Sequence, residues 1–389
     1  MPKVIPGLCV FQEEGYAKYK HRRLGLLCNQ ASINPDYTHA VDVIDKTLPG
    51  ALVAIFGPQH GLFGEKQDNM VPSPHFLDPN GRPVFSLYGD VRVPLDYMLE
   101  GLDAVLVDLP DVGCRVYTFA HTLRLLMESA SQRGIEIVIL DRPNPIGGLE
   151  REGNLLDEDC VSFVGLTPIP MRHGLSLGEL ALFMNHDLRD PVKLTIIPAK
   201  NWSRGDYFQD SNLPWVMPSP NLPTPECAHI YPGTVIFEGT NLSEGRGTTR
   251  PFHLVGAPFI DSKALKKALD QLNLPDVIFR EVSFQPCFHK WCGMPCPGVE
   301  IHPTGRGFKP YLTALSILQI VLRHHREDFA LKEPPYEYDY ERRPIDLILG
   351  RNSIFDSLSN GVSAMDLALS FEDEIKTFEK DLVGFLIYA

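Results

Sequence analysis

The sequence has no long apolar run and no excess of basic residues. No stretch approaches the ~20 apolar residues of a membrane-spanning helix, so we expect no segment that crosses a bilayer. Asp and Glu (49) outnumber Lys and Arg (36), and the formal net charge of −13 repels nucleic acids and anionic lipid surfaces. The composition therefore argues against a nucleic-acid or membrane partner.

A secretory signal and a disulfide framework are also missing. The N-terminal stretch has neither the longer apolar core nor the cleavage site of a signal peptide, and the eight cysteines are scattered along the chain. Both features favour a cytoplasmic location with free thiols. His289, Cys292 and Cys296 resemble part of a zinc site, but their spacing matches no standard finger, and we expect no metal.

Several common catalytic and nucleotide-binding motifs do not occur. No G-x-G-x-x-G follows the first predicted strand, and no Walker A, G-x-S-x-G or H-E-x-x-H sequence is present. These absences weigh against a nicotinamide cofactor, a P-loop nucleotide and the commonest serine and zinc hydrolases. We therefore expect no cofactor.

The chain itself is long enough for two domains. Its first half alternates short β-rich runs with helical patterns, which is typical of parallel strands joined by crossover helices. Apolar runs predict strands over 24–28, 52–56, 104–108 and 135–140, with a helix over 119–130. We expect a Rossmann-like, doubly wound parallel sheet whose ligand lies beyond the carboxyl ends of the strands.

Six prolines between 213 and 232 argue against a helix or a central strand and mark a boundary. We expect a Rossmann-like N-terminal domain over 1–228 and a smaller α/β C-terminal domain over 229–389, and two such domains usually leave a cleft between them. Within the second domain the patterns predict strands over 234–238, 278–284 and 299–302, and helices over 262–272 and 311–324.

Two motifs follow predicted strands of the first domain. FGPQHG would present Gln59 and His60 on a tight turn, where His60 either shuttles a proton or is a turn histidine bonded to backbone. DLPDVGCRVYT marks a strand-to-helix transition in which an aspartate is either a catalytic carboxylate or a helix cap. Its candidate residues are Asp108, Asp111, Arg115 and Tyr117.

Further candidates precede a helix with a capping-box pattern. Ser176 and Glu179 have the S-x-x-E spacing, so Glu179 is expected to be structural. Arg172 and His173, just ahead of that helix, are either ligands for an anionic group or ordinary loop residues. Asn29 and Asn221, both in predicted loops, are further substrate-binding candidates.

A glycine-rich loop in FEGTNLSEGRGTTRPF follows the proline-rich boundary. Its carboxylates and arginines suit glycosidic chemistry, in which one carboxyl acts as an acid and another group stabilises positive charge at the anomeric carbon. A surface loop with ion pairs is the alternative. The candidates are Glu238 as a catalytic residue, and Asn241, Glu244, Arg246 and Arg250 as substrate-binding residues.

With these segments in order, the chain resembles the exo-acting β-N-acetylmuramidase family. The resemblance spans nearly the whole chain and rests on the ordered blocks GPQHG, SLYG, DLPDVGCRVYTF, DRPNPIGG, PIPMRHGLSLGELA, PWVMPSPNLPT, YPGTVIFEGTNLSEGRGT and PFHLVGAP. It implies an active site between the two domains, release of N-acetylmuramic acid from the non-reducing end and no cofactor. The lactyl carboxylate of that sugar would need a cationic clamp, for which Arg115, Arg172, Arg246 and Arg250 are candidates.

The resemblance has one departure. Many members of the family carry a glutamate where this chain has Gln59, and an amide cannot donate a proton as an acid does. Either another carboxyl serves, with Glu238 first and Asp108, Asp111 and Glu244 after it, or the activity has changed. If the substrate's acetamido group is the internal nucleophile, Gln59 would orient it.

Three functions are compatible with these patterns. The first is an exo-glycosidase of peptidoglycan recycling, acting in the cytoplasm on a small sugar substrate. The second is a muropeptide-binding or sensing protein without turnover, and the third is an esterase or amidase acting on the substituents of muramic acid. Turnover of a chromogenic muramic acid glycoside separates the first from the other two.

Overall fold

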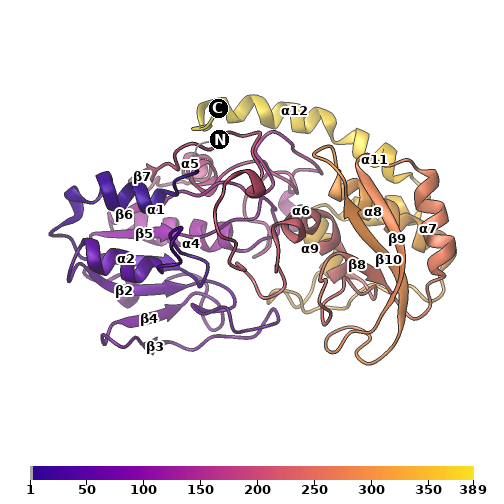
Figure 1. Cartoon of the computed structure of the whole chain (residues 1–389), viewed down its shortest axis with the longest axis horizontal. Coiled ribbons are helices and arrows are strands. Elements are labelled where there is room, and N and C mark those ends of the chain that lie inside the picture. The colour runs from indigo at the N-terminus through magenta and orange to yellow at the C-terminus, as the bar shows by residue number, and fades with distance from the viewer. Residues whose placement is uncertain (1–2) are drawn as a thin grey trace.

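The first domain is built on a seven-stranded sheet. A computed structural model describes residues 3–389 and gives the strand order β3-β4-β2-β1-β5-β6-β7, in which β3 is antiparallel to β4 and the other pairs are parallel (Figure 1). The predicted doubly wound sheet is thereby confirmed. The strands are β1 Leu24–Cys28, β2 Leu52–Gly57, β3 Phe76–Leu77, β4 Pro83–Ser86, β5 Ala104–Asp108, β6 Glu136–Leu140 and β7 Leu194–Ile197.

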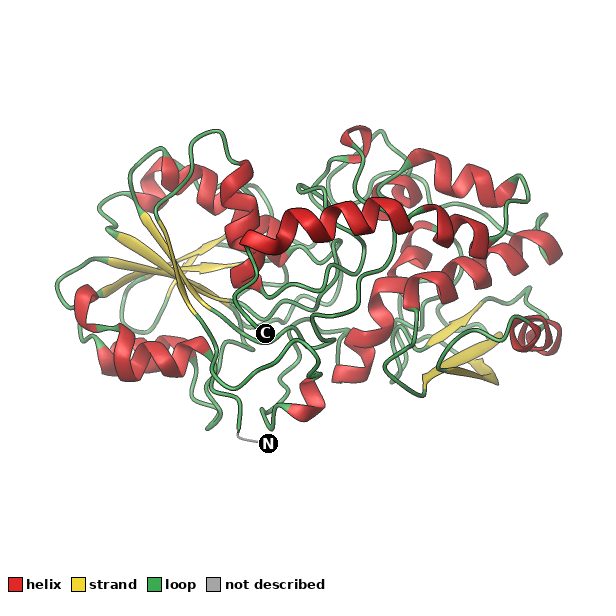
Figure 2. Cartoon of the chain, turned by 90° about the horizontal axis from the view of Figure 1, so that it is seen from above, coloured by secondary structure: helices red, strands yellow, loops and turns green. Residues whose placement is uncertain are grey.

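Helices cover both faces of this sheet, which explains its apolar strands (Figure 2). Successive side chains of a strand point to opposite faces, so Leu26 of β1 packs in one apolar cluster and Leu27 in another. The Leu26 cluster includes residues of α1 and α2, whereas the Leu27 cluster includes residues of α4 and α5. The helices of this domain are α1 Gly7–Val10, α2 Ala40–Thr47, α3 Asp96–Leu99, α4 Phe119–Ser131 and α5 Leu177–Asp187.

The second domain is smaller and combines a three-stranded antiparallel sheet, in the order β8-β10-β9, with helices. The expected helices at 262–272 and 311–324 and the expected strands at 278–284 and 299–302 are all present, within three residues of their predicted ends. The elements are α6 Pro225–Thr234, β8 Leu254–Gly256, α7 Ser262–Gln271, β9 Val277–Phe284, β10 Cys296–Pro303, α8 Pro310–His324, α9 Pro344–Leu349, α10 Asn352–Ser359, α11 Ala364–Ser370 and α12 Glu372–Asp381.

Two expectations at the boundary are wrong. The proline-rich stretch contains helix α6, and residues 235–239 form a 3-10 helix where a strand is predicted. Pro225 takes the first turn of α6, where its missing N–H costs nothing, and the Thr224 side chain caps the helix by accepting from the backbone N–H of Cys227. Pro232 lies inside the last turn, close to the change to 3-10 geometry.

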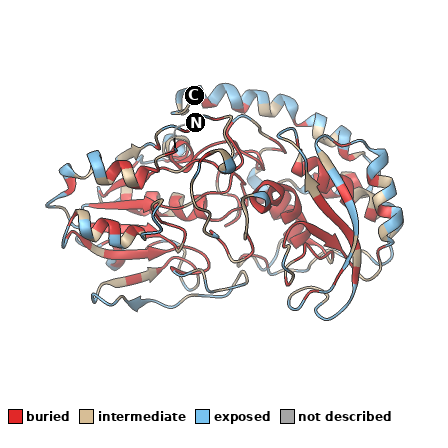
Figure 3. Ribbon diagram, viewed as in Figure 1, coloured by how far each residue is buried: buried red, intermediate tan, exposed pale blue. Residues whose placement is uncertain are grey.

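One apolar core runs through both domains. Residues of β5 and α4 belong to the same buried cluster as residues of α6, α8 and α9, and buried ribbon continues from one domain into the other (Figure 3). No helix of residues 3–389 combines the length and apolar character needed to cross a membrane.

The last helix leads the chain back to the first domain. Helix α12 runs along the top of both domains in Figure 1 and ends close to the N-terminus. Phe378 and Phe385 then pack edge-on against Phe183 of α5, with ring centroids 5.6 Å and 5.5 Å apart. The Tyr388 hydroxyl donates to Asp141 Oδ2 at 2.7 Å, directly after β6.

Candidate active site

The turn after β2 carries two of the sequence candidates into a buried position. Gln59 and His60 follow Gly57, the last residue of β2, and their exposed fractions are 7% and 6%. His60 has a φ of +70°, a left-handed conformation that costs a non-glycine residue about 1 kcal/mol or more and therefore concentrates at functional sites.

Gln59 is held by three side chains. Its Nε2 donates to Glu337 Oε1 at 2.9 Å and to the Tyr88 hydroxyl at 3.0 Å, while its Oε1 accepts from Thr118 Oγ1 at 2.5 Å. Because Thr118 and Tyr88 come from the first domain and Glu337 from the second, this amide joins the two domains.

Glu337 is a functional candidate that the sequence does not reveal. It lies between α8 and α9, has an exposed fraction of 5%, and also accepts from the Tyr88 hydroxyl at Oε2, at 2.7 Å. Burial raises the pKa of this carboxyl to about 7, and the nearby charge of Glu238 adds to the increase. A carboxyl with such a pKa can give and take a proton near neutral pH.

Glu238 follows α6 and lies in a different environment. Arg246 Nη2 donates to Glu238 Oε1 at 2.6 Å, and the Tyr336 hydroxyl donates to Oε2 at 2.9 Å. Both partners stabilise the ionised form of this buried carboxylate. The Nη1 atom of Arg246 is buried and has no hydrogen-bond partner among the described residues.

A second carboxylate of the glycine-rich loop completes this cluster. Glu244 is fully buried, accepts from Lys290 Nζ at 2.7 Å, and lies 3.4 Å from Arg246 Nε and 3.4 Å from His289 Nδ1. The charge of Lys290 is the main opposing influence to burial and holds the pKa of Glu244 at about 2. Glu244 is therefore a charged anchor for Arg246.

His60 faces the same cluster. Its Nδ1 lies 2.7 Å from the backbone oxygen of Lys66 and its Nε2 lies 3.2 Å from Ser219 Oγ. Burial lowers the pKa of His60 to about 4, the positive charge of Arg246 lowers it further, and the charge of Glu238 acts in the opposite direction. The imidazole is therefore neutral at pH 7. Its pKa responds to groups of both domains, namely Lys66 and Asp68 of the first and Arg246 and Glu238 of the second.

The two aspartates of the DLPDVGCRVYT motif contact other partners. Arg142 binds both oxygens of Asp108, at 2.5 Å and 2.8 Å, so Asp108 has a structural partner. Asp111 Oδ1 accepts from the backbone N–H of Gly113 at 2.7 Å and lies 3.3 Å from His173 Nε2. Asp111 Oδ2 is buried without a partner among the described residues.

The buried arginines of the first domain bind backbone oxygens. Arg115 donates to the carbonyls of Asn154, Ile169, Ile348 and Leu349, at 2.7–3.3 Å. Arg172 Nη2 donates to the carbonyl of Ile146 and to the Tyr207 hydroxyl. These contacts occupy both terminal nitrogens of Arg115, whereas the Nε and Nη1 atoms of Arg172 are buried without a partner among the described residues.

The remaining candidates make local contacts. Asn29 donates to the carbonyl of Pro218, Asn221 to that of Gln67 and Asn241 to that of Asp328. Tyr117 packs against Phe119, with ring centroids 4.6 Å apart, and its hydroxyl has no partner among the described residues.

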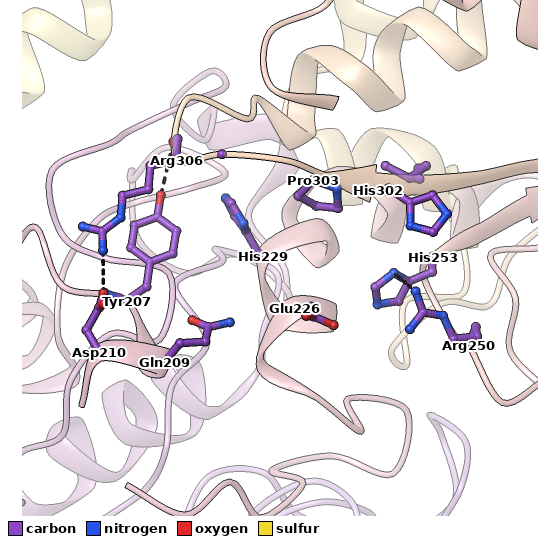
Figure 4. Close-up of a pocket in the computed structure, with 12 residues that line it drawn as sticks. Tyr207, Gln209, Asp210, Glu226, His229, Arg250, His253, His302, Pro303 and Arg306 are labelled. Atoms are coloured by element: carbon purple, nitrogen blue, oxygen red, sulfur yellow. Dashed lines mark hydrogen bonds and ion pairs between the residues drawn. The ribbon is translucent and has the colours of Figure 1, made fainter. Parts of the chain in front are cut away.

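A separate pocket of about 480 Å³ lies between the domains and contains Arg250 (Figure 4). Two of its arginines are paired, since Arg250 binds Glu300 at 3.1 Å and Arg306 binds Asp210 at 2.6 Å. Arg250 is the sequence candidate that lines it, whereas Glu238 and Glu337 do not.

Comparisons with known proteins agree with this two-domain arrangement. Residues 24–226 match the family model described as exo-β-N-acetylmuramidase NamZ, N-terminal, and residues 229–388 match the corresponding C-terminal model. The chain is 39% identical over 388 residues to the peptidoglycan β-N-acetylmuramidase NamZ of Bacillus subtilis, with 100% of this chain and 92% of the relative covered.

Two solved structures have the same fold. Both are DUF1343 family proteins from Bacteroides fragilis, one 29% identical with a TM-score of 0.90 and 100% of each chain covered, the other 27% identical with a TM-score of 0.78 and 99% of each chain covered. Together, the two family models cover nearly all of the sequence, and this chain therefore belongs to the exo-β-N-acetylmuramidase family.

Proposed function

We propose that this protein is an exo-β-N-acetylmuramidase, which hydrolyses the glycosidic bond of a terminal N-acetylmuramic acid in peptidoglycan fragments. Its family membership supports this activity, and the main structural support is the meeting of the two domains at Gln59. There, groups that can transfer protons and groups that can stabilise charge lie together.

The two glutamates of this cluster have the unequal environments that glycosidic cleavage requires. Glu238 is ion-paired with Arg246, and its carboxylate is placed to stabilise the positive charge that develops at the anomeric carbon. Glu337 has a neutral hydrogen-bonding environment and a raised pKa. Pairs of carboxyls whose environments separate their pKa values are typical of acid and base assignments.

Arg246 is our candidate for binding the lactyl carboxylate. Its Nη2 and Nε atoms face Glu238 and Glu244, and Nη1 remains available for a substrate anion. A guanidinium can bind a carboxylate strongly through charge-assisted hydrogen bonds. The overall negative charge of the protein makes such a local cation necessary.

We also propose that the enzyme acts in the cytoplasm, in peptidoglycan recycling. The eight cysteines support this location, since each is present as a free thiol.

Turnover of 4-nitrophenyl β-N-acetylmuramide tests the activity and the site together. We expect release of nitrophenol by the unmodified protein, and a loss of about two to four orders of magnitude in kcat for Glu238→Gln, because the amide removes the stabilising charge. Glu226→Gln is the matched control, since Glu226 is exposed and lines the separate pocket. It should retain full activity.

Each alternative gives a different result. Saturable binding of N-acetylmuramic acid without nitrophenol release would indicate a binding or sensing protein. Release of lactate or acetate with the glycosidic bond intact would indicate an esterase or amidase. Loss of activity in Glu226→Gln but not in Glu238→Gln would move the active site to the pocket of Figure 4.

A further inference from the structure

The turn that carries Glu337 has an unusual conformation. Tyr336 and Asp339 exchange two backbone hydrogen bonds of 2.9 Å, and the two residues between them, Glu337 and Tyr338, have φ values of +48° and +65°. A two-residue turn with both φ values positive favours Asn-Gly and similar pairs, not Glu-Tyr. Residues held in such conformations indicate a functional constraint at that position.

The turn directs the Glu337 carboxyl into the junction between the domains. Gln59 Nε2 holds one oxygen and the Tyr88 hydroxyl holds the other, so the plane of the carboxyl is fixed. Tyr88 is itself oriented, because its oxygen accepts from Gln59 Nε2 and from the backbone N–H of Met70. An oriented Tyr88 therefore donates its own proton to Glu337.

From this arrangement we propose that Glu337 is the general acid that protonates the glycosidic oxygen, an assignment that rests on the proposed function. No arginine or lysine forms an ion pair with its carboxyl among the described residues. Arg92 donates to the backbone oxygen of Glu337 and not to its carboxyl. The acidic neighbour Glu238 disfavours the ionised form, as burial does.

The proposed step balances in protons and electrons. Glu337 gives its proton to the glycosidic oxygen while the electron pair of the bond to the anomeric carbon moves onto that oxygen. Glu238 stabilises the positive charge left on the sugar. A water molecule then adds its hydroxide to the anomeric carbon and returns a proton to the Glu337 carboxylate.

Dependence on the leaving group tests this role. A nitrophenolate departs without protonation, whereas the sugar alkoxide of an N-acetylmuramyl-N-acetylglucosamine disaccharide does not. In Glu337→Gln we expect kcat/KM to fall about 10²- to 10⁴-fold for the disaccharide and less than about tenfold for the nitrophenyl glycoside. The alkaline decline of kcat/KM for the disaccharide near pH 7 should disappear.

Two further variants distinguish the loss of a proton donor from a folding defect. Glu333→Gln changes an exposed carboxyl four residues earlier in the same segment and should match the unmodified enzyme. Glu337→Ala should regain activity on the disaccharide when formate is added in an acidic buffer, where part of it is formic acid, because this small acid can enter the vacated space and donate its proton.

The outcomes separate the two proposals. Equal losses on both substrates, or no rescue by formate, would overturn the role of Glu337 while leaving the glycosidase activity in place. If the unmodified protein cleaves neither substrate, the proposed function itself fails.

Discussion

At the scale of single residues, the amide of Gln59 contacts two groups that can carry a proton, the Glu337 carboxyl and the Tyr88 hydroxyl. Its oxygen accepts from Thr118 and its nitrogen donates to Glu337 and Tyr88, so the three bonds define which way the amide lies. A glutamate at this position would bring a second carboxyl to hydrogen-bonding distance of Glu337. Two such carboxyls cannot both ionise easily and would share a proton.

We therefore expect Gln59→Ala to lose more activity than Gln59→Glu. The glutamate can rebuild the bond to Glu337 through the shared proton, whereas alanine removes the donor to Glu337 Oε1 and one of the two donors to Tyr88. Measurement of kcat on the disaccharide from pH 5 to 9 compares the two, and in Gln59→Glu the alkaline decline should move to higher pH. The opposite ranking would contradict an orienting role for the amide.

At the scale of structural elements, Arg115 connects the loop after β5 with helix α9 of the other domain. Its guanidinium donates to two carbonyls of the first domain and to those of Ile348 and Leu349 at the end of α9. The carbonyls at the end of a helix have no partner within the helix, so this arginine satisfies groups that burial would otherwise leave unpaired.

Replacement of this residue should affect stability rather than substrate binding. In Arg115→Lys the ammonium cannot reach four carbonyls at once, and we expect the free energy of unfolding to fall by about 3 kcal/mol with KM within about twofold. Urea unfolding and steady-state kinetics measure the two effects. Arg250→Lys, which alters a half-exposed ion pair, should cost less than about 1 kcal/mol. An increase in KM without destabilisation would instead place Arg115 in the substrate clamp.

The sequence correctly predicts those elements in which the pattern of apolar residues matches the pattern of burial. Strands β1, β2, β5 and β6 are buried on both faces and therefore read as continuous apolar runs. The number of prolines argues against a helix at α6, but their positions do not. Pro225 occupies the first turn of this helix, where proline is tolerated. The 3-10 helix over 235–239 is missed because its β-branched and aromatic residues favour a strand.

The candidate site is predicted only in part, for related reasons. Motifs after strands identify Gln59 and His60, and the glycine-rich loop identifies Glu238 and Arg246. No motif identifies Glu337, because the sequence Tyr-Glu-Tyr-Asp around it contains neither the Asn nor the Gly that would predict a left-handed turn. Composition likewise cannot reveal that both terminal nitrogens of Arg115 donate to backbone carbonyls.

At the scale of the whole molecule, burial of histidines links stability to pH. Burial lowers the pKa of His60, His121 and His253 to about 4 and that of His229 to about 3. Each pKa is lower in the folded than in the unfolded protein. The stability that each contributes is therefore present above about pH 6.5 and is lost as the pH falls toward 4.

We expect His121→Gln to make stability less dependent on acid. Between pH 7 and pH 5 the decrease in the free energy of unfolding should be about 2 kcal/mol smaller than in the unmodified protein. The reason is that one fewer histidine, buried and neutral in the folded protein, takes up a proton on unfolding. Urea denaturation at both pH values provides the measurement. His21→Gln, at an exposed position, should leave the decrease unchanged. Equal decreases in all three proteins would refute this origin of the acid sensitivity.

The return of the chain after α12 also sets an order of events during biosynthesis. Asp141 lies next to β6, but its hydrogen bond with the Tyr388 hydroxyl can form only after the ribosome has added Tyr388, 247 positions later in the chain. At a translation rate of about 5–20 residues per second, that delay is on the order of 10–50 seconds. During the part of this delay that follows synthesis of β7, the Rossmann-like sheet has all of its strands but lacks the contact that Tyr388 makes beside β6.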